Sequence, residues 1–111
     1  MREEFFMERR EQFKRWLQNE RMKKSGNPIP EKIIECYLRN VHKISDVMYE
    51  SGVISKRLYS MRSVEEVNDA IKSISKDRTY LTMNTKSENT CDKALRYYAA
   101  FTQALYQEQE E

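Results

Sequence analysis

With 111 residues, the chain has enough length for one domain with a single hydrophobic core and no room for two. Its two glycines and two prolines leave too few turns for a β-sandwich or barrel, and its seven tyrosines, four phenylalanines and one tryptophan argue against a disordered chain. The formal net charge of +2 is too small by itself to indicate nucleic-acid binding. We therefore expect an all-α fold, a compact bundle of four main helices over residues 1–105, followed by a frayed acidic tail over 106–111.

The first predicted helix covers residues 3–23. Phe13, Trp16 and Leu17 fall within one arc of its helical wheel, so this arc is expected to face the core. The following stretch, Ser-Gly-Asn-Pro-Ile-Pro over residues 25–30, breaks the helix because glycine favours a helix C-cap and the prolines cannot continue a helix.

The second predicted helix covers residues 31–49 and is expected to be the central one. Its apolar residues occupy more than half of the helical circumference, which indicates contact with neighbours on two sides. These residues are Ile33, Ile34, Tyr37, Leu38, Val41, Ile44, Val47 and Met48. Gly52 ends the helix, and residues 53–61 form a short connection with room for one helical turn.

The third predicted helix runs from Ser63 to residue 75. Its first residues, Ser-Val-Glu-Glu, have the form of a capping box, in which the serine hydroxyl and the second glutamate each satisfy a backbone N–H. Residues 77–84 are expected to form a loop whose Tyr80, Leu81 and Met83 fold back onto the core.

The last predicted helix covers residues 86–105, and a second capping box over residues 85–88 is expected to open it. Its two faces differ in chemistry. The apolar face has the i, i+3, i+4, i+7 spacing of a core-facing stripe, formed by Cys91, Ala94, Leu95, Tyr98, Phe101 and Leu105. The opposite face is basic and carries amides, and it consists of Lys86, Asn89, Lys93 and Arg96.

Cys36 and Cys91 are the only cysteines, and both lie at the edges of apolar helical stripes. Two reduced, buried thiols in a cytoplasmic protein are the expected arrangement, and a disulfide between the two helices is the alternative. The sequence has no signal-peptide pattern and no run of about 18 apolar residues, which agrees with a cytoplasmic location.

No catalytic motif occurs in the sequence, so we do not expect an enzyme, a cofactor or a metal site. His42 is the single histidine and has no acid or nucleophile signature near it. Tyrosine attack on a phosphodiester would need several arginines and histidines around the phosphate, and one histidine cannot supply them. Glu65, Glu66 and Asp69 could be imagined as metal ligands, but helix capping and the helix dipole explain the first two.

Two groups of basic residues remain as candidates for binding a polyanion. Lys23 and Lys24 end the first helix, where cations complement the helix dipole, and they could also form a phosphate-contacting corner with the loop that follows. The basic face of the last helix has residue types that contact phosphates and base edges, although a solvated helix surface would look the same.

Three stretches of the sequence together resemble a known family. They are Phe-Lys-Arg-Trp-Leu over residues 13–17, Ile-Ile-x-x-Tyr-Leu over 33–38, and Ala-Leu-Arg-Tyr-Tyr-x-x-Phe over 94–101. This order resembles the SAM-like N-terminal, core-binding domain of phage integrases and other tyrosine recombinases. It is also similar to the helical domain that precedes nuclease or ATPase domains in some restriction-modification proteins.

The resemblance implies a four-helix domain that clamps duplex DNA while another domain or partner protein cuts or joins it. In such domains the contacts come from the loop after the first helix, the start of the second helix and the last helix. The corresponding residues here are Lys23, Lys24, Asn27, Lys32, Lys86, Asn89, Lys93 and Arg96. The recombinase catalytic domain, with its arginine, histidine and tyrosine residues, has no counterpart in this sequence, so strand transfer by this chain alone is not expected.

The sequence thus predicts a non-catalytic DNA-binding domain of a restriction or mobile-element protein, which binds duplex DNA through backbone charge. The alternative is a helical protein-interaction or dimerisation module. Phe5, Phe6 and Met7 extend the apolar stripe of the first helix beyond the needs of a small core, and contiguous exposed apolar area often marks an interface.

Overall fold

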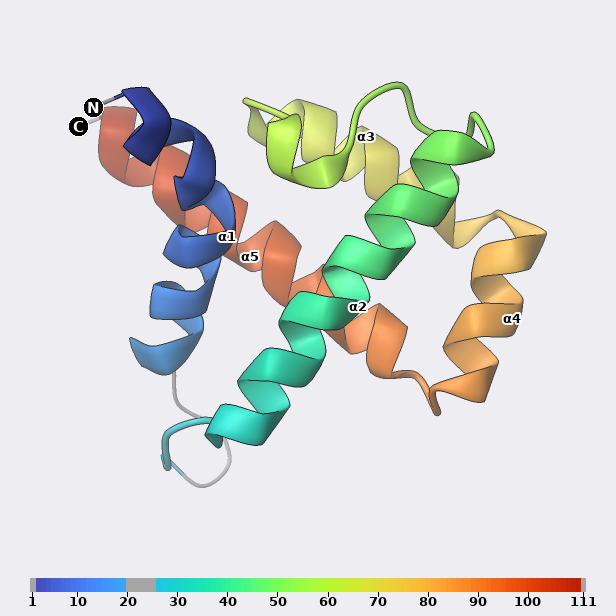
Figure 1. The fold of residues 1–111 in the computed structure, drawn as a ribbon, viewed down its shortest axis with the longest axis horizontal. Coiled ribbons are helices and arrows are strands. Elements are labelled where there is room, and N and C mark those ends of the chain that lie inside the picture. Colours follow the sequence, from blue (N-terminus) through green and yellow to red (C-terminus); the bar gives the residue numbers. More distant parts are fainter. Residues whose placement is uncertain (1, 20–25, 111) are drawn as a thin grey trace.

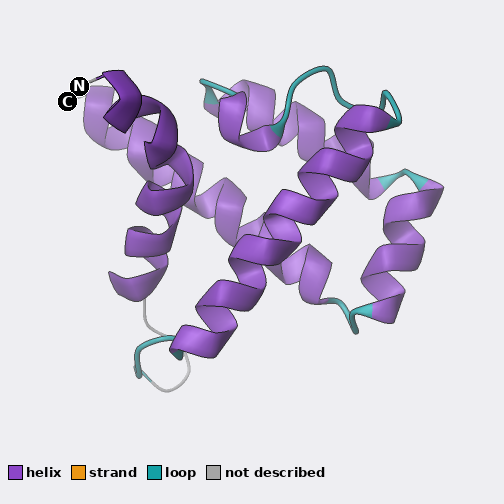
Figure 2. Cartoon of the chain, in the orientation of Figure 1, coloured by secondary structure: helices purple, strands orange, loops and turns teal. Residues whose placement is uncertain are grey.

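The computed structural model describes the backbone of residues 2–19 and 26–110, and the side chains of residues 9–19 and 26–107. All of the regular elements in these ranges are helical (Figures 1 and 2), which confirms the all-α class. The structure has five α-helices where four were predicted, and one short 3-10 helix. In chain order they are α1 (Arg2–Asn19), α2 (Glu31–Glu50), η1 (Leu58–Ser60), α3 (Val64–Ser75), α4 (Arg78–Lys86) and α5 (Thr90–Glu110).

The two longest helices, α2 and α5, cross at the centre of the fold (Figure 1). Helix α1 packs against both of them, α3 packs along α5, and α4 joins α3 to the start of α5. The beginning of α1 lies beside the end of α5, where Arg9 donates a 3.0 Å hydrogen bond to the Tyr106 hydroxyl and lies over its ring. The prediction of a central second helix is therefore correct, and α5 shares that role.

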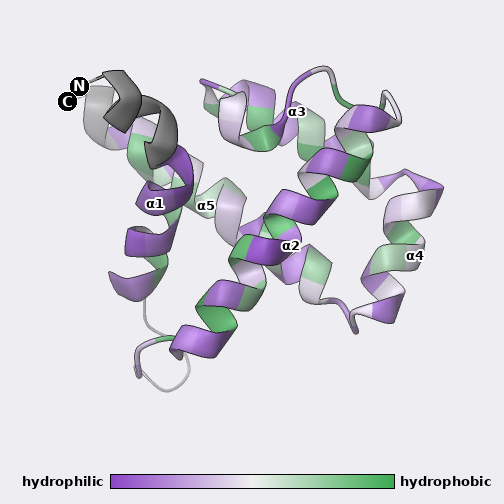
Figure 3. Cartoon of the chain, viewed as in Figure 1, coloured by the Kyte–Doolittle hydropathy of each residue, from purple (hydrophilic) through white to green (hydrophobic). Residues whose placement is uncertain are grey.

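The core forms where the apolar stripes of α1, α2 and α5 meet. Phe13 of α1 lies edge-on to Tyr98, with ring centroids 5.1 Å apart, and contacts Phe101 at 5.3 Å. Full burial of each such side chain contributes about 2 kcal/mol to the free energy of folding. The hydropathy colouring alternates along α2 and α5 (Figure 3), as expected of helices with one buried and one exposed face.

The connection between α2 and α3 is fixed by buried hydrogen bonds to Leu58. The Ser45 hydroxyl of α2 accepts a 2.8 Å hydrogen bond from the Leu58 N–H, and the Tyr98 hydroxyl of α5 donates to the Leu58 carbonyl at 3.2 Å. Leu58 itself is fully buried and lies in η1, the one helical turn for which the sequence left room. A backbone segment without a long helix thus has its polar groups satisfied inside the core.

The predicted capping box of α3 is present with a shifted partner. The Ser63 hydroxyl accepts a 3.0 Å hydrogen bond from the Glu66 N–H, as expected. The Glu66 carboxylate accepts from the N–H of Arg62, one residue before the cap, at 2.7 Å, and it also binds Lys56 at 2.8 Å. These hydrogen bonds, that to Lys56 first, lower the pKa of Glu66.

The predicted loop over residues 77–84 is wrong, because most of it forms α4. The Asp77 side chain caps this helix by accepting a 3.1 Å hydrogen bond from the Tyr80 N–H. Tyr80 is buried and Met83 is half-buried, but Leu81 is 47% exposed and does not fold back onto the core. With one fully buried side chain, α4 lacks the apolar periodicity by which a helix is recognised in a sequence.

The predicted start of the last helix is also wrong. Lys86 ends α4, Glu88 and Asn89 have positive φ angles of 57° and 71°, and α5 begins at Thr90. A capping box over residues 85–88 therefore does not form. Side chains before the turn cap α5 instead: the Ser87 hydroxyl accepts from the Cys91 N–H at 3.1 Å, and Asn84 Oδ1 accepts from the Asp92 N–H at 2.9 Å. At its other end α5 continues to Glu110 rather than ending near Leu105.

Both cysteines are free thiols, so the disulfide alternative does not occur in this structure. Asn40 lies between them. Its Oδ1 atom accepts a 3.4 Å hydrogen bond from the Cys91 thiol, and its Nδ2 atom donates to the Cys36 carbonyl at 2.8 Å. Asn40 thereby joins the middle of α2 to the start of α5.

Among the described residues, no helix combines the length and apolar character needed to cross a membrane. The same part of the chain contains no group of three or more His, Cys, Asp or Glu side chains that could hold a metal ion.

Candidate polyanion-binding surface

The predicted DNA-binding residues of the first loop are described only in part. Lys23 and Lys24 lie outside the described residues, and so do the side chains of Phe5, Phe6 and Met7 that the interaction-module alternative invokes. Asn27 is exposed in the segment before α2, and Lys32 is exposed in the first turn of α2.

The turn between α4 and α5 separates two further predicted residues from the last helix. Lys86 is exposed at the end of α4. The Asn89 side chain is engaged within the turn, where its Oδ1 atom accepts a 3.2 Å hydrogen bond from Asn84. Asn89 therefore helps to hold the left-handed turn through its side-chain oxygen.

Lys93 and Arg96 lie on the exposed side of α5, as predicted. The buried faces of α2 and α5 pack against each other, so their exposed faces point in opposite directions. Lys93 and Arg96 consequently do not share a surface with Lys32. Arg96 is also bound to Asp92 of the same helix at 3.1 Å, which reduces the positive charge it offers.

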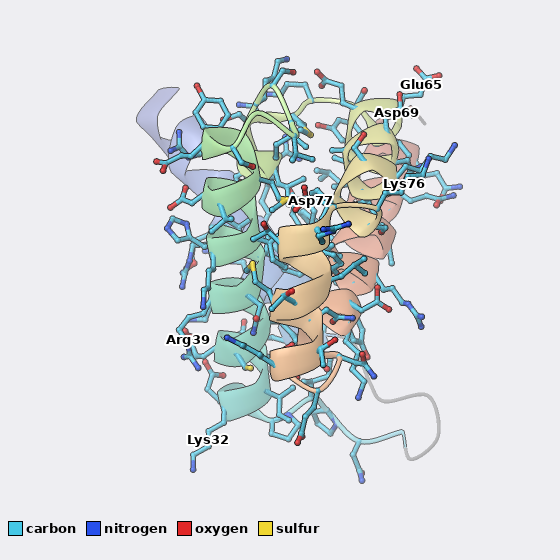
Figure 4. All side chains as sticks on the ribbon, turned by 90° about the vertical axis from the view of Figure 1, so that its right-hand side faces the viewer. Lys32, Arg39, Glu65, Asp69, Lys76 and Asp77 are labelled. Atoms are coloured by element: carbon cyan, nitrogen blue, oxygen red, sulfur yellow. The ribbon has the colours of Figure 1, made fainter. Side chains whose placement is uncertain are left out.

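The exposed face of α2 carries a basic stripe that the sequence analysis missed. Arg39 and Lys43 are exposed and lie on the same side of the helix as Lys32, opposite its buried residues. Lys32 and Arg39 both extend outward from α2 in Figure 4. We call Lys32, Arg39 and Lys43 the α2 basic stripe. Their positions on the helical wheel, directly opposite the apolar arc, were a signal available in the sequence.

Every carboxylate of α2 lies in an ion pair, whereas the α2 basic stripe has no acidic partner in the part of the chain that the structure describes. Glu35 lies 3.8 Å from Arg10 and 3.5 Å from Lys14, and Glu31 lies 4.0 Å from Lys14. At the other end of the helix, Arg57 of the following connection lies 2.7 Å from Asp46 and 3.8 Å from Glu50. Within the described part of the chain, Lys32, Arg39 and Lys43 form no ion pair.

The carboxylate of Asp46 is held in its charged form by Arg57. Their hydrogen bond lowers the pKa of Asp46, and His42 at 3.4 Å contributes in the same direction when it is protonated. His42 is exposed on this face, and its one close acidic neighbour is already bound to an arginine.

Two open clefts flank the α2 basic stripe. One, of about 570 Å³, lies toward α1 and is lined by Arg10, Leu38, Arg39, Asn40, His42 and Lys43. The other, of about 550 Å³, lies toward α4; we call it the α2–α4 cleft, and it is lined by Asn40, Lys43, Thr79, Thr82, Met83, Lys86, Ser87 and Cys91. The described residues that line the two clefts include no carboxylate, so both clefts favour anions.

Two exposed acidic residues of α3 lie away from the α2 basic stripe. Glu65 and Asp69 are exposed on α3, which lies at the opposite end of the view in Figure 4 from Lys32. Lys76 at the end of α3 is the labelled cation nearest to them in that view. The start of α3 thus carries exposed acidic side chains away from Lys32 of the α2 basic stripe.

Comparison with protein-family models, curated proteins and solved structures finds no match for this chain. The resemblance to the recombinase and restriction-modification domains stays a prediction from the three sequence stretches that suggest it.

Proposed function

We propose that this chain is a non-catalytic module that binds duplex DNA through its phosphate backbone, using the α2 basic stripe. The observation that supports this proposal is a set of three exposed cations that have no acidic partner among the described residues, on a helix whose own carboxylates are all paired. Cations with no carboxylate partner remain available to replace the counterions of a nucleic-acid backbone.

The dimensions of α2 suit this ligand. With a rise of about 1.5 Å per residue, the ammonium of Lys32 and that of Lys43 project from points roughly 16 Å apart along the helix. An exposed α-helix fits the major groove of B-DNA, and basic side chains along it can contact the phosphates on either side. The stripe consists of charged groups alone, so it favours positioning on the backbone over reading of the base sequence.

The biological setting proposed here is the targeting part of a restriction or mobile-element protein, with a catalytic domain on the same chain or on a partner. This setting depends on the sequence resemblance described above. The described residues that line the two clefts beside α2 include cations and no carboxylate, which supports a polyanionic partner independently of that resemblance.

Salt dependence tests the proposal directly. If the three stripe residues each neutralise one phosphate, the affinity for a duplex of about 20 base pairs falls roughly 40-fold between about 50 mM and about 200 mM salt. Fluorescence anisotropy with a labelled duplex measures this. An affinity that is unchanged over that range contradicts the phosphate-contact model.

A pair of matched double variants tests which helix makes the contacts. Arg39→Gln with Lys43→Gln removes two positive charges from α2, and Lys93→Gln with Arg96→Gln removes the same two residue types from α5. The first variant should lower the steepness of the salt dependence by about two phosphates, and the second should leave it unchanged. A loss that appears only with the α5 variant would assign the site to the residues first predicted from the sequence.

A further inference from the structure

The α2–α4 cleft presents side-chain donors from both of its walls. Lys43 lies on the α2 wall, and Thr79, Thr82 and Lys86 lie on the α4 wall. Neither lysine forms an ion pair, and neither threonine hydroxyl forms a hydrogen bond, among the described residues. The cleft thus contains two ammonium groups and two hydroxyls whose hydrogen-bonding capacity is unused within the fold.

These donors face the same space because of helical spacing. Thr79, Thr82 and Lys86 follow an i, i+3, i+7 pattern, which places them in one row along α4. The buried Tyr80 anchors α4 to the core from another side of the helix. The row of donors is therefore turned toward α2 by the same packing that fixes α4.

The floor of the cleft is less polar than its walls. Asn40 is already engaged by the Cys91 thiol at 3.4 Å and by the Cys36 carbonyl at 2.8 Å. Met83 is half-buried, and together with Cys91 it offers polarizable, apolar surface. A ligand in the cleft would meet charge and hydroxyls at the walls and sulfur-containing side chains below.

The backbone at the start of α5 does not add donors to this site. The Cys91 N–H donates to the Ser87 hydroxyl, the Asp92 N–H donates to Asn84, and the Lys93 N–H donates to the Asn89 carbonyl at 3.1 Å. Any anion in the cleft must therefore be held by side chains, with Lys43 and Lys86 supplying the charge.

We propose that the α2–α4 cleft binds the phosphate of a small phosphomonoester with a planar or apolar body, of the class of a nucleoside monophosphate. Such a phosphate has a charge of about −1.5 to −2 and three acceptor oxygens, which match two ammonium groups and two hydroxyls. The volume of about 550 Å³ is in the range of small-molecule sites. This site goes beyond the proposed DNA surface, because it uses α4 and does not require Lys32, Arg39 or Arg10.

Titration of the ¹⁵N-labelled full chain with adenosine monophosphate and with adenosine tests the site. The monophosphate should shift the amide signals of residues 79–87 and bind at least about tenfold more tightly than the nucleoside, because two charge-assisted contacts are lost without the phosphate. Equal binding of the two compounds, or no shift at a monophosphate concentration of about 10 mM, overturns the proposal.

Two variants, each checked by circular dichroism, locate the contacts. Lys86→Gln and Thr82→Val should each weaken binding of the monophosphate, by about tenfold and about threefold, and both residues are exposed so the fold should persist. Lys93→Gln, on the far face of α5, is the matched lysine control and should have no effect. An unchanged affinity for Lys86→Gln refutes the site even if Thr82→Val behaves as expected.

A further titration distinguishes two ligands that carry such a phosphate, a free nucleotide and the 5′ end of a nucleic-acid strand. A tetranucleotide with a 5′-phosphate is compared with the same molecule bearing a 5′-hydroxyl. Tighter binding of the phosphorylated tetranucleotide than of adenosine monophosphate identifies a strand end as the ligand, and the reverse order identifies a free nucleotide. Equal binding of the two tetranucleotides, together with equal binding of nucleoside and nucleotide, rejects both.

Comparison of Arg39→Gln with Lys86→Gln tests the monophosphate site and the DNA-binding surface separately. Arg39→Gln should weaken duplex binding and leave monophosphate binding unchanged, whereas Lys86→Gln should do the opposite. Loss of both activities in Arg39→Gln would contradict the separate cleft, and loss of neither would contradict the α2 basic stripe as the duplex site.

Discussion

Helices α2 and α5 are alike in their inner faces and different in their outer ones. Each has a long apolar stripe, and the two stripes cross at the centre of the core. The outer face of α2 has a cleft on either side and three cations that form no ion pair with any described residue, whereas on α5 Arg96 is paired with Asp92. Two amphipathic helices that are equivalent in packing can therefore differ in what they offer to a partner.

The largest expected effect concerns the inner faces and should be similar for both helices. Leu38 of α2 and Leu95 of α5 are almost completely buried. Replacement of either by alanine should lower the free energy of unfolding by about 2–5 kcal/mol, because each leaves a cavity in a packed core. Urea denaturation followed by circular dichroism measures the loss. Arg39→Ala, on the outer face, is the control and should change stability by less than about 0.5 kcal/mol.

Clearly different losses in the free energy of unfolding for the two leucine variants would show that the inner faces of α2 and α5 do not contribute equally to the core. If Leu38→Ala were nearly neutral while Leu95→Ala unfolded the protein, α5 alone would organise the core, and α2 would be attached to it only weakly.

Charge reversal on the outer face of α2 should lower duplex affinity more than charge reversal on the outer face of α5. Arg39→Glu with Lys43→Glu places two negative charges at the proposed DNA surface and should lower duplex affinity by roughly 100-fold at low salt, which corresponds to about 2.7 kcal/mol. Lys93→Glu with Arg96→Glu makes the same change in net charge on α5 and should lower affinity only a few-fold, through the general loss of positive charge. Equal losses for the two variants would mean that net charge alone drives binding.

The residues changed in these variants also show which parts of the fold could be predicted from the sequence. The stripes that contain Leu38 and Leu95 follow from apolar periodicity, and both were assigned correctly to the core. Helix α4 was missed because Tyr80 is its one fully buried residue and its other residues are mostly threonine, asparagine and basic side chains. A helix stabilised mainly by an Asp77 cap and one aromatic anchor has little periodicity to detect.

The candidate surface was harder to predict than the fold. Lys93 and Arg96 were correctly expected to be exposed, and so was Lys32, but no pattern in the sequence states that α2 and α5 cross with their exposed faces in opposite directions. The clustering of Lys43 with Lys86 depends on where α4 stands relative to α2, and α4 was itself not predicted. Which charges meet is a property of helix packing, which the helical wheel of a single helix does not contain.

Removal of the Tyr98 hydroxyl, which forms a hydrogen bond in the core, should have a smaller effect on stability. Tyr98→Phe removes the 3.2 Å hydrogen bond to the Leu58 carbonyl, which keeps a 3.2 Å hydrogen bond from the Met61 N–H. The free energy of unfolding should fall by about 0.5–1.5 kcal/mol, the net contribution of one hydrogen bond. Tyr59 is the matched control, since its ring lies 5.5 Å from that of Tyr98 and its buried hydroxyl has no hydrogen-bond partner among the described residues. Tyr59→Phe should be neutral or slightly stabilising. Thermal denaturation that ranks Tyr59→Phe below Tyr98→Phe would contradict both assignments.

The smallest effect is the response of Tyr59→Phe to alkaline pH. Burial raises the pKa of Tyr59 to about 12, although the charge of Arg10 acts in the opposite direction. In the unfolded chain a tyrosine loses its proton near pH 10, so between about pH 10 and pH 12 the unfolded state binds fewer protons than the folded state and stability falls as the pH rises. For Tyr59 this loss should be about 0.4 kcal/mol at pH 10 and about 0.8 kcal/mol at pH 10.5.

Tyr59→Phe removes this contribution, so its stability should decline less between pH 9 and pH 10.5 than that of the unmodified protein. Urea denaturation at the two pH values gives the difference, and Tyr98, whose pKa is raised mainly by burial, continues to contribute in both proteins. Identical declines would show that the Tyr59 hydroxyl ionises freely and is therefore in contact with water. The Tyr59 hydroxyl would then belong to the protein surface, and Tyr98 would be the outermost buried tyrosine of this part of the core.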